Sequence, residues 1–227
     1  SGQLGCLARS ARALCRRLAG GRYGSIVRPP AQSFDTSLII LGLSGALNHD
    51  PSAALLVDGE VVAAAEEERF TRIKHARNHM PVAATEYCLD AGGISALDVD
   101  VVAFPYAPIS LASPARWHYA RRYWYAPDRA LDAIFNGNRR FRRNRGRVRE
   151  AGLQVGIDWD RTRFVPVEHH LAHASSAYHL GGFEGKTAVM SVDGKGEYAT
   201  TFFGYAEGGR IHRIKEFYDP DSLSSVY

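Results

Sequence analysis

The chain has 227 residues, of which 45% are hydrophobic and 23% are charged. This ordinary globular balance excludes a disordered chain, a collagen-like repeat and a small disulfide scaffold, and no apolar stretch approaches the roughly 20 residues of a membrane-spanning helix. Three cysteines, Cys6, Cys15 and Cys88, are an odd number without metal-ligand spacing. We therefore expect a reducing, cytoplasmic environment, no structural disulfide and no membrane partner.

The net charge of +4 conceals an uneven distribution along the sequence. Residues 1–34 carry six arginines and no acidic residue, and residues 116–149 carry eleven arginines against two aspartates. The rest of the chain has eleven basic and 22 acidic residues, a balance of −11. The sequence therefore predicts an acidic body with two basic additions, and it argues against a uniformly nucleic-acid-binding surface.

The first basic addition, residues 1–37, spaces leucines at helical intervals between its arginines. Such a segment is compatible with an amphipathic, transit-peptide-like helix, or with a leader that has no fixed structure. We expect the flexible leader, ending near Arg28-Pro29-Pro30.

A strand-rich block follows. Apolar runs predict strands at residues 38–41, 53–57 and 61–65, and Asp58-Gly59 supplies the positive φ angles of a tight hairpin between the second and third. Pro81 begins an expected helix that reaches Asp90 and ends at Gly92-Gly93. Residues 99–104 then predict another strand.

A second block repeats this pattern about 149 residues later. A strand at residues 164–167 and a helix at residues 168–180 lead into expected strands at 187–192, 198–205 and 211–217. We predict an α/β fold with duplicated subdomains, the first at residues 38–186 and the second at 187–227 with only its first three strands. Either the natural chain continues or another polypeptide completes the second copy.

An irregular insert at about residues 106–163 mixes arginines with aromatic residues. One interpretation is a surface that contacts RNA or phosphate, because arginine neutralises charge and aromatic rings stack. The other is a solvated helical excursion whose aromatic residues pack on the core.

The densest group of potential ligands lies in residues 168–179. If this segment is a helix, His169 and His173 stand at i and i+4 on one face, where both rings can reach one metal ion. Asp193 follows the next strand and is the natural third ligand, although Asp193-Gly194 is also good turn chemistry. Imidazole suits iron, zinc, copper or nickel, so the pair alone does not choose the metal.

Two further segments carry candidate chemistry. In the loop after the first strand, His49 and Asp50 can orient a carbonyl or take a proton, although Asp50-Pro51-Ser52 is equally a good turn. Lys74 can hold a phosphate as a point charge. The neighbouring glutamates, Glu66 to Glu68, can also form surface ion pairs with Arg69 and Arg72.

Four blocks together resemble the O-carbamoyltransferases of antibiotic and nodulation-factor biosynthesis. The blocks are residues 49–59 (HDPSAALLVDG), 66–75 (EEERFTRIKH), 169–177 (HHLAHASSA) and 192–197 (VDGKGE). The resemblance covers about residues 38–104 and 164–227. It implies an actin-like ATPase (ribonuclease H-like) fold, and a carbamoyl group that passes from carbamoyl phosphate, through an ATP-derived carbamoyl-adenylate, to a substrate hydroxyl.

The resemblance also implies roles for particular residues. It implies a divalent ion, Fe(II) above all, bound by His169, His173 and Asp193, with His49 and Lys74 at the transfer site. We further assign substrate contacts to Asn48, Asp50 and His170, and phosphate contacts to Gly194, Lys195 and Gly196, whose backbone amides can face a phosphate. The implied partners are a small-molecule hydroxyl acceptor and the missing C-terminal half with its carbamoyl-adenylate-forming domain, in the same or another chain.

Two other functions remain open. The related tRNA threonylcarbamoyl-transfer enzymes share the fold and the His-x-x-x-His pair, and the arginine-rich insert would suit tRNA. The Glu66 to Phe70 block and the doubled His169-His170 favour the small-molecule branch, so we do not expect a nucleic-acid partner. A non-catalytic partial domain that completes another subunit is the third possibility.

Overall fold

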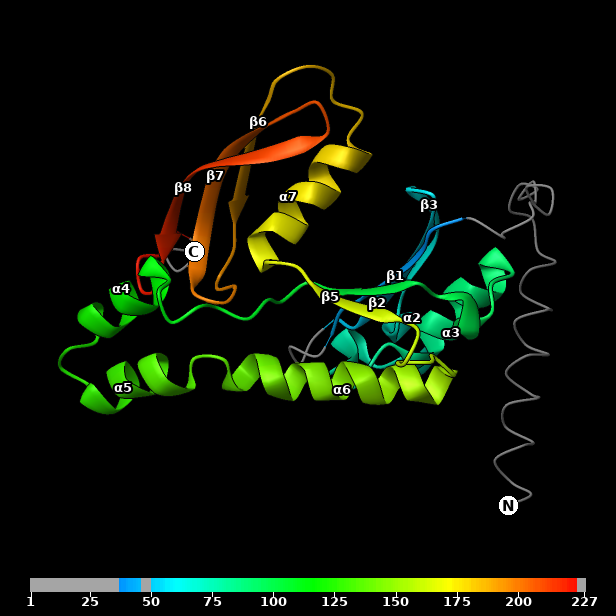
Figure 1. Cartoon of the computed structure of the whole chain (residues 1–227), viewed down its shortest axis with the longest axis horizontal. Helices are drawn as coiled ribbons and strands as arrows, with labels where there is room; N and C mark the ends of the chain where they lie inside the picture. The colour runs from blue at the N-terminus through cyan, green and yellow to red at the C-terminus, as the bar shows by residue number, and fades with distance from the viewer. Residues whose placement is uncertain (1–36, 46–49, 224–227) are drawn as a thin grey trace. The chain divides into compact units, whose positions relative to one another are not determined.

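The computed structural model describes residues 37–45 and 50–223 (Figure 1). The predicted basic leader lies outside the described residues except for Ser37, and so do Asn48 and His49 of the first loop. Among the helices of the two described ranges, none combines the length and apolarity that a membrane crossing requires.

A five-stranded sheet, sheet A, forms the first half of the fold. Its order is β3-β2-β1-β4-β5, and only β2 runs against the others. The strands are β1 (Ile39–Leu43), β2 (Ser52–Val57), β3 (Glu60–Glu66), β4 (Val101–Phe104) and β5 (Arg163–Pro166). Alternate residues of β1 are buried, as expected for a strand with one face on the core. The mixed α/β class is confirmed, and the strand order fits an actin-like, ribonuclease H-like subdomain.

Short helices follow the β2–β3 hairpin: α2 (Glu68–Thr71), η1 (Lys74–Ala76), α3 (Val82–Gly92) and η2 (Ala96–Asp98). The predicted helix after Pro81 is α3, which packs on β2 and β3. The carboxylate of Glu67 accepts hydrogen bonds from the amides of Ala83 and Ala84, 3.2 and 2.8 Å long, and so satisfies the first turn of α3. Glu67 is therefore buried, and only its neighbours Glu66 and Glu68 form the expected ion pairs with Arg69.

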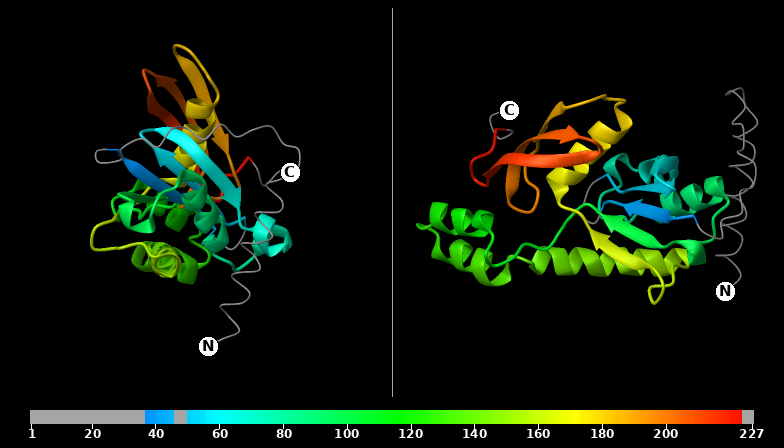
Figure 2. Two further views of the ribbon diagram at one scale, coloured as in Figure 1. Left: turned by 90° about the vertical axis from the view of Figure 1, so that its right-hand side faces the viewer. Right: turned by 45° about the horizontal axis from the view of Figure 1, so that its top comes forward.

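Three helices occupy most of the predicted insert: α4 (Pro114–Arg122), α5 (Pro127–Asn136) and α6 (Arg139–Val155). The expectation of an irregular insert is wrong for α6, because this helix crosses over from β4 to β5 and runs along sheet A (Figure 2). Its Phe141 and Val148 lie in the main hydrophobic core. α6 is thus part of the fold, and the added structure is the α4–α5 pair.

The aromatic residues of the insert divide between core and surface. Tyr119 packs edge-on against Tyr198 with ring centroids 5.4 Å apart, as the second interpretation expects. Trp124 and Phe135, in contrast, are 79% and 76% exposed. The structure therefore gives the insert a packed side and a side that is open to solvent.

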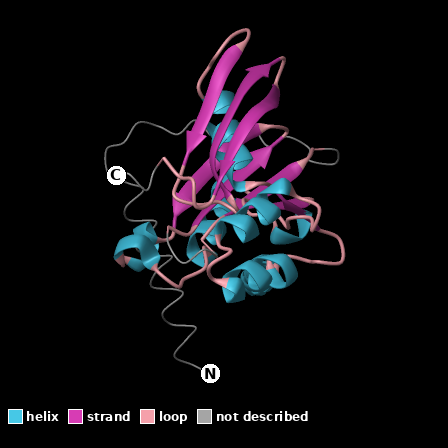
Figure 3. Ribbon diagram, turned by 90° about the vertical axis from the view of Figure 1, so that its left-hand side faces the viewer, coloured by secondary structure: helices cyan, strands magenta, loops and turns pink. Residues whose placement is uncertain are grey.

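The second half contains a three-stranded antiparallel sheet, sheet B, in the order β6-β7-β8 (Figure 3). The elements are α7 (His169–Leu180), β6 (Thr187–Val192), β7 (Ala199–Glu207) and β8 (Arg210–Tyr218). Sheet B repeats the antiparallel meander of β1 to β3, so the predicted duplication of supersecondary structure is confirmed for these strands. Helix α7 contacts all three strands of sheet B.

Candidate metal centre

Two chain segments bring the predicted ligands together. Strand β5 ends at Pro166, and α7 begins three residues later with His169, so that the first turn of the helix lies at the carboxyl edge of sheet A. Asp193 comes directly after β6, and its amide donates to the carbonyl of Thr200 on the neighbouring strand. Both segments therefore deliver side chains from the ends of regular elements, which fixes their positions.

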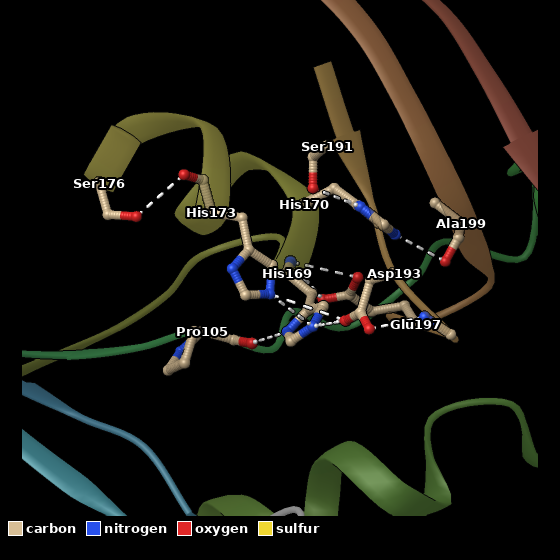
Figure 4. Close-up of polar contacts among 10 residues, drawn as sticks. Pro105, His169, His170, His173, Ser176, Ser191, Asp193, Glu197 and Ala199 are labelled. Carbon is tan, nitrogen blue, oxygen red and sulfur yellow. Dashed lines mark hydrogen bonds and ion pairs between the residues drawn. The ribbon is translucent and has the colours of Figure 1, made fainter. Parts of the chain in front are cut away.

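The three side chains converge on one another (Figure 4). The Nε2 atom of His169 lies 2.7 Å from Oδ2 of Asp193 and 3.1 Å from Nε2 of His173, and the His173 nitrogen lies 3.7 Å from the same carboxylate oxygen. Ligands of one transition-metal ion at about 2.1 Å stand roughly 3 to 3.5 Å apart. The three separations bracket this range, and the donor set is therefore compatible with one metal ion.

The tautomer of His169 supports this fit. Its Nδ1 lies 3.2 Å from the carbonyl oxygen of Pro105, which can only accept, so the proton belongs to Nδ1. In the neutral ring, Nε2 then presents a lone pair to the carboxylate of Asp193. Two lone pairs 2.7 Å apart require a shared cation, either a proton or a metal ion. A backbone carbonyl on the far ring nitrogen is also the usual support of a metal-binding histidine.

Burial and neighbouring charges favour the ligating forms of the other two residues. Burial lowers the pKa of His173, and the adjacent His169 lowers it further. For Asp193, burial opposes ionisation, but the neighbouring His169, the hydrogen bond from the amide of Gly194 and the nearby His173 outweigh it and hold the pKa below its ordinary value. The chain thus keeps one neutral imidazole and one carboxylate in the group.

Glu197 is a site residue that the sequence analysis did not identify. Its buried carboxylate accepts hydrogen bonds from the amide of His169, at 3.1 Å, and from the amide of Ala107, at 2.7 Å. Burial raises its pKa, although these amide bonds act in the opposite direction. Glu197 therefore fixes the first turn of α7. The only sign of this role in the sequence is the presence of a carboxylate four residues beyond Asp193.

His170 does not fit the substrate-binding role assigned to it. It is only 3% exposed. Its Nε2 donates to the carbonyl of Ala199 at 2.9 Å, and its Nδ1 accepts from the hydroxyl of Ser191 at 3.0 Å. Both ring nitrogens are therefore used inside the protein, and burial lowers the pKa of the ring. His170 ties α7 to sheet B.

The predicted phosphate contacts are also engaged within the protein. The Gly194 amide donates to the Asp193 carboxylate at 2.6 Å, and the Gly196 amide donates to the carbonyl of Ala199 at 2.8 Å. The ammonium group of Lys195 pairs with Asp219 and lies over the ring of Tyr119. This loop closes the β6–β7 hairpin, and its donors do not face an open phosphate site.

The residues of the predicted transfer site are only partly described. Asn48 and His49 lie outside the described residues. Lys74 is exposed in η1, and within the described ranges no hydrogen bond or ion pair engages its ammonium group. The residue after Lys74 is His75, and the Oδ1 atom of Asp50 lies 2.9 Å from the Nδ1 atom of its ring. Asp50 and Lys74 are therefore brought to one loop cluster.

This geometry belongs to a chain of the carbamoyltransferase family. A family profile described as "Carbamoyltransferase N-terminus" matches residues 39–227. The match includes all three converging side chains and the loop that carries Asp50, so the resemblance drawn from the four sequence blocks is confirmed.

Two relatives agree with this assignment. Nodulation protein NolNO of Sinorhizobium fredii is 32% identical over 206 residues, which are 84% of this chain and 28% of the relative. Uncharacterized protein sll1178 of Synechocystis sp. is 34% identical over 193 residues, which are 83% of this chain and 30% of the relative. The chain therefore spans less than a third of the length of these relatives.

Among solved structures, YeaZ from Pseudomonas aeruginosa is similar at 17% identity with a TM-score of 0.43. The similarity covers 80% of this chain and 67% of that one.

Proposed function

We propose that this chain is the metal-binding part of an O-carbamoyltransferase, which moves a carbamoyl group from carbamoyl phosphate, through an ATP-derived carbamoyl-adenylate, to a hydroxyl of a small natural product. The observation that carries the proposal is the convergence of His169, His173 and Asp193 in a chain of this family. We assign adenylate formation and most of the acceptor pocket to polypeptide outside this chain, in the same or another protein.

We propose that the three converging side chains bind one divalent ion, and Fe(II) is our first choice. Nitrogen and oxygen donors of this kind suit iron, and three protein ligands leave positions for substrate. Such an ion, when bound, supplies Lewis acidity toward the acyl or phosphate oxygens of the donor.

The protein's own groups then have separate tasks. Glu197 and the Pro105 carbonyl hold His169 in orientation. Lys74, exposed at the same edge of sheet A, offsets the charge of the leaving phosphate as a point charge. The sequence analysis allows His49 either to take the proton of the acceptor hydroxyl or to orient a carbonyl, and we now propose the second role.

The test uses the complete protein with His173→Ala. We expect loss of the bound metal and a fall of at least a hundredfold in carbamoyl transfer, with adenylate formation unchanged, because only the ligand set is altered. Metal content is measured by elemental analysis and adenylate formation by pyrophosphate exchange.

His179→Ala is the matched control, since this histidine is exposed near the other end of the same helix. It should keep both metal and activity. Unchanged metal content in His173→Ala would remove the metal assignment, and a wild-type protein that transfers no carbamoyl group to any hydroxyl would remove the proposed function.

A further inference from the structure

A second histidine, His75, is held by an acidic residue outside the metal centre. The carboxylate of Asp50 accepts a hydrogen bond from Nδ1 of His75 over 2.9 Å. The two side chains are 52% and 45% exposed. Since a carboxylate only accepts, the proton of the neutral ring lies on Nδ1, and Nε2 presents its lone pair. This is the arrangement of an imidazole oriented for proton transfer.

The backbone holds the pair rigidly. The amide of Asp50 donates to the carbonyl of His75 at 3.0 Å, and the amide of His75 donates to Oε2 of Glu68 at 2.7 Å. Asp50 and His75 both have left-handed backbone angles, with φ of 49° and 61°. Non-glycine residues adopt this conformation at an energetic cost, and such strain clusters at functional sites.

Glu68 completes a group of three possible ligands with Asp50 and His75. The Oε2 of Glu68 already accepts the His75 amide, and its Oε1 lies 3.9 Å from Arg69. We therefore interpret Glu68 as a support of the loop and not as a ligand. Besides Glu68 and Asp50, the charged residue nearest to His75 along the chain is Lys74, which directly precedes it in the sequence. From the facing helix α6, Arg147 reaches the carbonyl of Asn78.

The pair lies at the same edge of sheet A as the metal centre. The hydroxyl of Ser44 donates to the carbonyl of Asp50, at 3.3 Å. Strands β1 and β4 are parallel neighbours, so the segment with Ser44 and the segment with Pro105, whose carbonyl holds His169, leave sheet A at the same edge. Neighbouring strands are about 4.8 Å apart, so these two segments start side by side. A substrate of modest size can reach both groups.

We propose that Asp50 and His75 form a catalytic dyad that takes the proton of the acceptor hydroxyl, an inference that rests on the proposed carbamoyl transfer. The acceptor oxygen forms a bond to the carbamoyl carbon, and the bond from that carbon to the phosphate oxygen breaks, its electron pair leaving with the phosphate. The hydroxyl proton moves to Nε2 of His75 and then to solvent. Asp50 fixes the ring tautomer throughout and is a positioning residue.

The activity test compares His75→Ala with His79→Ala in the complete protein. His79 lies in the same loop, is exposed, and has its Nδ1 at 3.0 Å from the carbonyl of Arg77 instead of a carboxylate. We expect His75→Ala to lower kcat by about 10²–10⁴-fold and added imidazole to restore part of it. His79→Ala should behave as wild type. Transfer at the wild-type rate in His75→Ala would overturn the dyad and leave the proposed function intact.

A second measurement needs no carbamoyl transfer. Diethyl pyrocarbonate acylates imidazole lone pairs, and mass spectrometry reports the rate at each histidine. We expect His75 to react faster than His79, and Asp50→Asn to slow His75 several-fold, because the amide can donate to Nδ1 and favour the other tautomer. If His75 and His79 were acylated at equal rates and Asp50→Asn did not change the rate at His75, the dyad would be overturned. This outcome does not depend on whether the proposed carbamoyl transfer is correct.

Discussion

The adjacent residues His169 and His170 have opposite roles because successive positions on a helix point about 100° apart. His169 shares a face with His173, and the i, i+4 spacing was sufficient to predict that pair from the sequence. His170 instead shares its buried side with Ala174. Nothing in the local sequence separates a histidine that faces the edge of a sheet from one that bonds Ser191 and Ala199, since both partners are more than twenty residues away.

At the residue scale we also predict an unreactive thiol. Cys88 is fully buried in α3, and burial raises its pKa to about 11. The thiol therefore stays neutral in the folded protein at pH 8, and its contribution to stability, complete below the ordinary thiol pKa of 9.0, is lost as the pH rises from there to about 11. In a Cys6→Ser/Cys15→Ser variant, Ellman's reagent should label this chain at pH 8 only after urea unfolds it. Rapid labelling of the folded variant would contradict this.

At the scale of elements, the strands and α3 were predictable because alternation, the Asp58-Gly59 turn and Pro81 are local signals. Helix α6 was not recognised as a core element. Its buried positions, among them Phe141, Val148 and Ala151, have helical spacing but stand among seven arginines. Arginine stems can lie along apolar surface, and Arg145 and Arg149 lie over the rings of Phe164 and Trp159. Composition therefore concealed the apolar face.

Replacing the two glycines inside α6 by alanine should change the stability of the protein in opposite directions. A Cβ at Gly146 meets nothing within 4 Å, whereas a Cβ at Gly152 would lie 2.5 Å from the ring of Trp159. We expect Gly146→Ala to stabilise the protein by about 0.5–1 kcal/mol through helix propensity. Gly152→Ala should destabilise it by about 1–3 kcal/mol through overpacking. Thermal unfolding of the two variants provides the measurement, and melting temperatures that shift in the same direction would contradict the packing of α6.

On the scale of the whole described chain, one carboxylate connects the two sheets. Glu197 lies in the β6–β7 loop of sheet B and accepts the amide of Ala107, three residues beyond β4 of sheet A, as well as that of His169. The sequence could not predict this connection, because its partners are 90 and 28 residues distant and the residue itself stands in a turn. Asp193 was predictable because the end of an apolar strand followed by a glycine is a recognisable position in the sequence.

Removing this connection has a measurable consequence. Glu197→Ala leaves two partly buried amides without their carboxylate acceptor, and we expect a loss of about 1–3 kcal/mol in unfolding free energy. Hydrogen exchange at Ala107 and His169 should accelerate strongly, whereas amides within β1 and β2 should stay protected. Glu197→Gln retains a carbonyl acceptor and should lose less. Unchanged exchange at both amides in the alanine variant would show that the loop is held by other contacts.

The antiparallel meander occurs in both sheets, and its second turn, β2–β3 in sheet A and β7–β8 in sheet B, lies at the strand ends away from the metal centre. Strand β2 runs from Ser52 at the carboxyl edge to the turn that precedes Glu60, and β7 runs from Ala199, beside His170, to the turn that precedes Arg210. Both turn-flanking positions, Glu60 and Arg210, are exposed. A fluorescent donor and acceptor attached there would report the separation of the two halves during turnover, with no dye near the groups that do the chemistry.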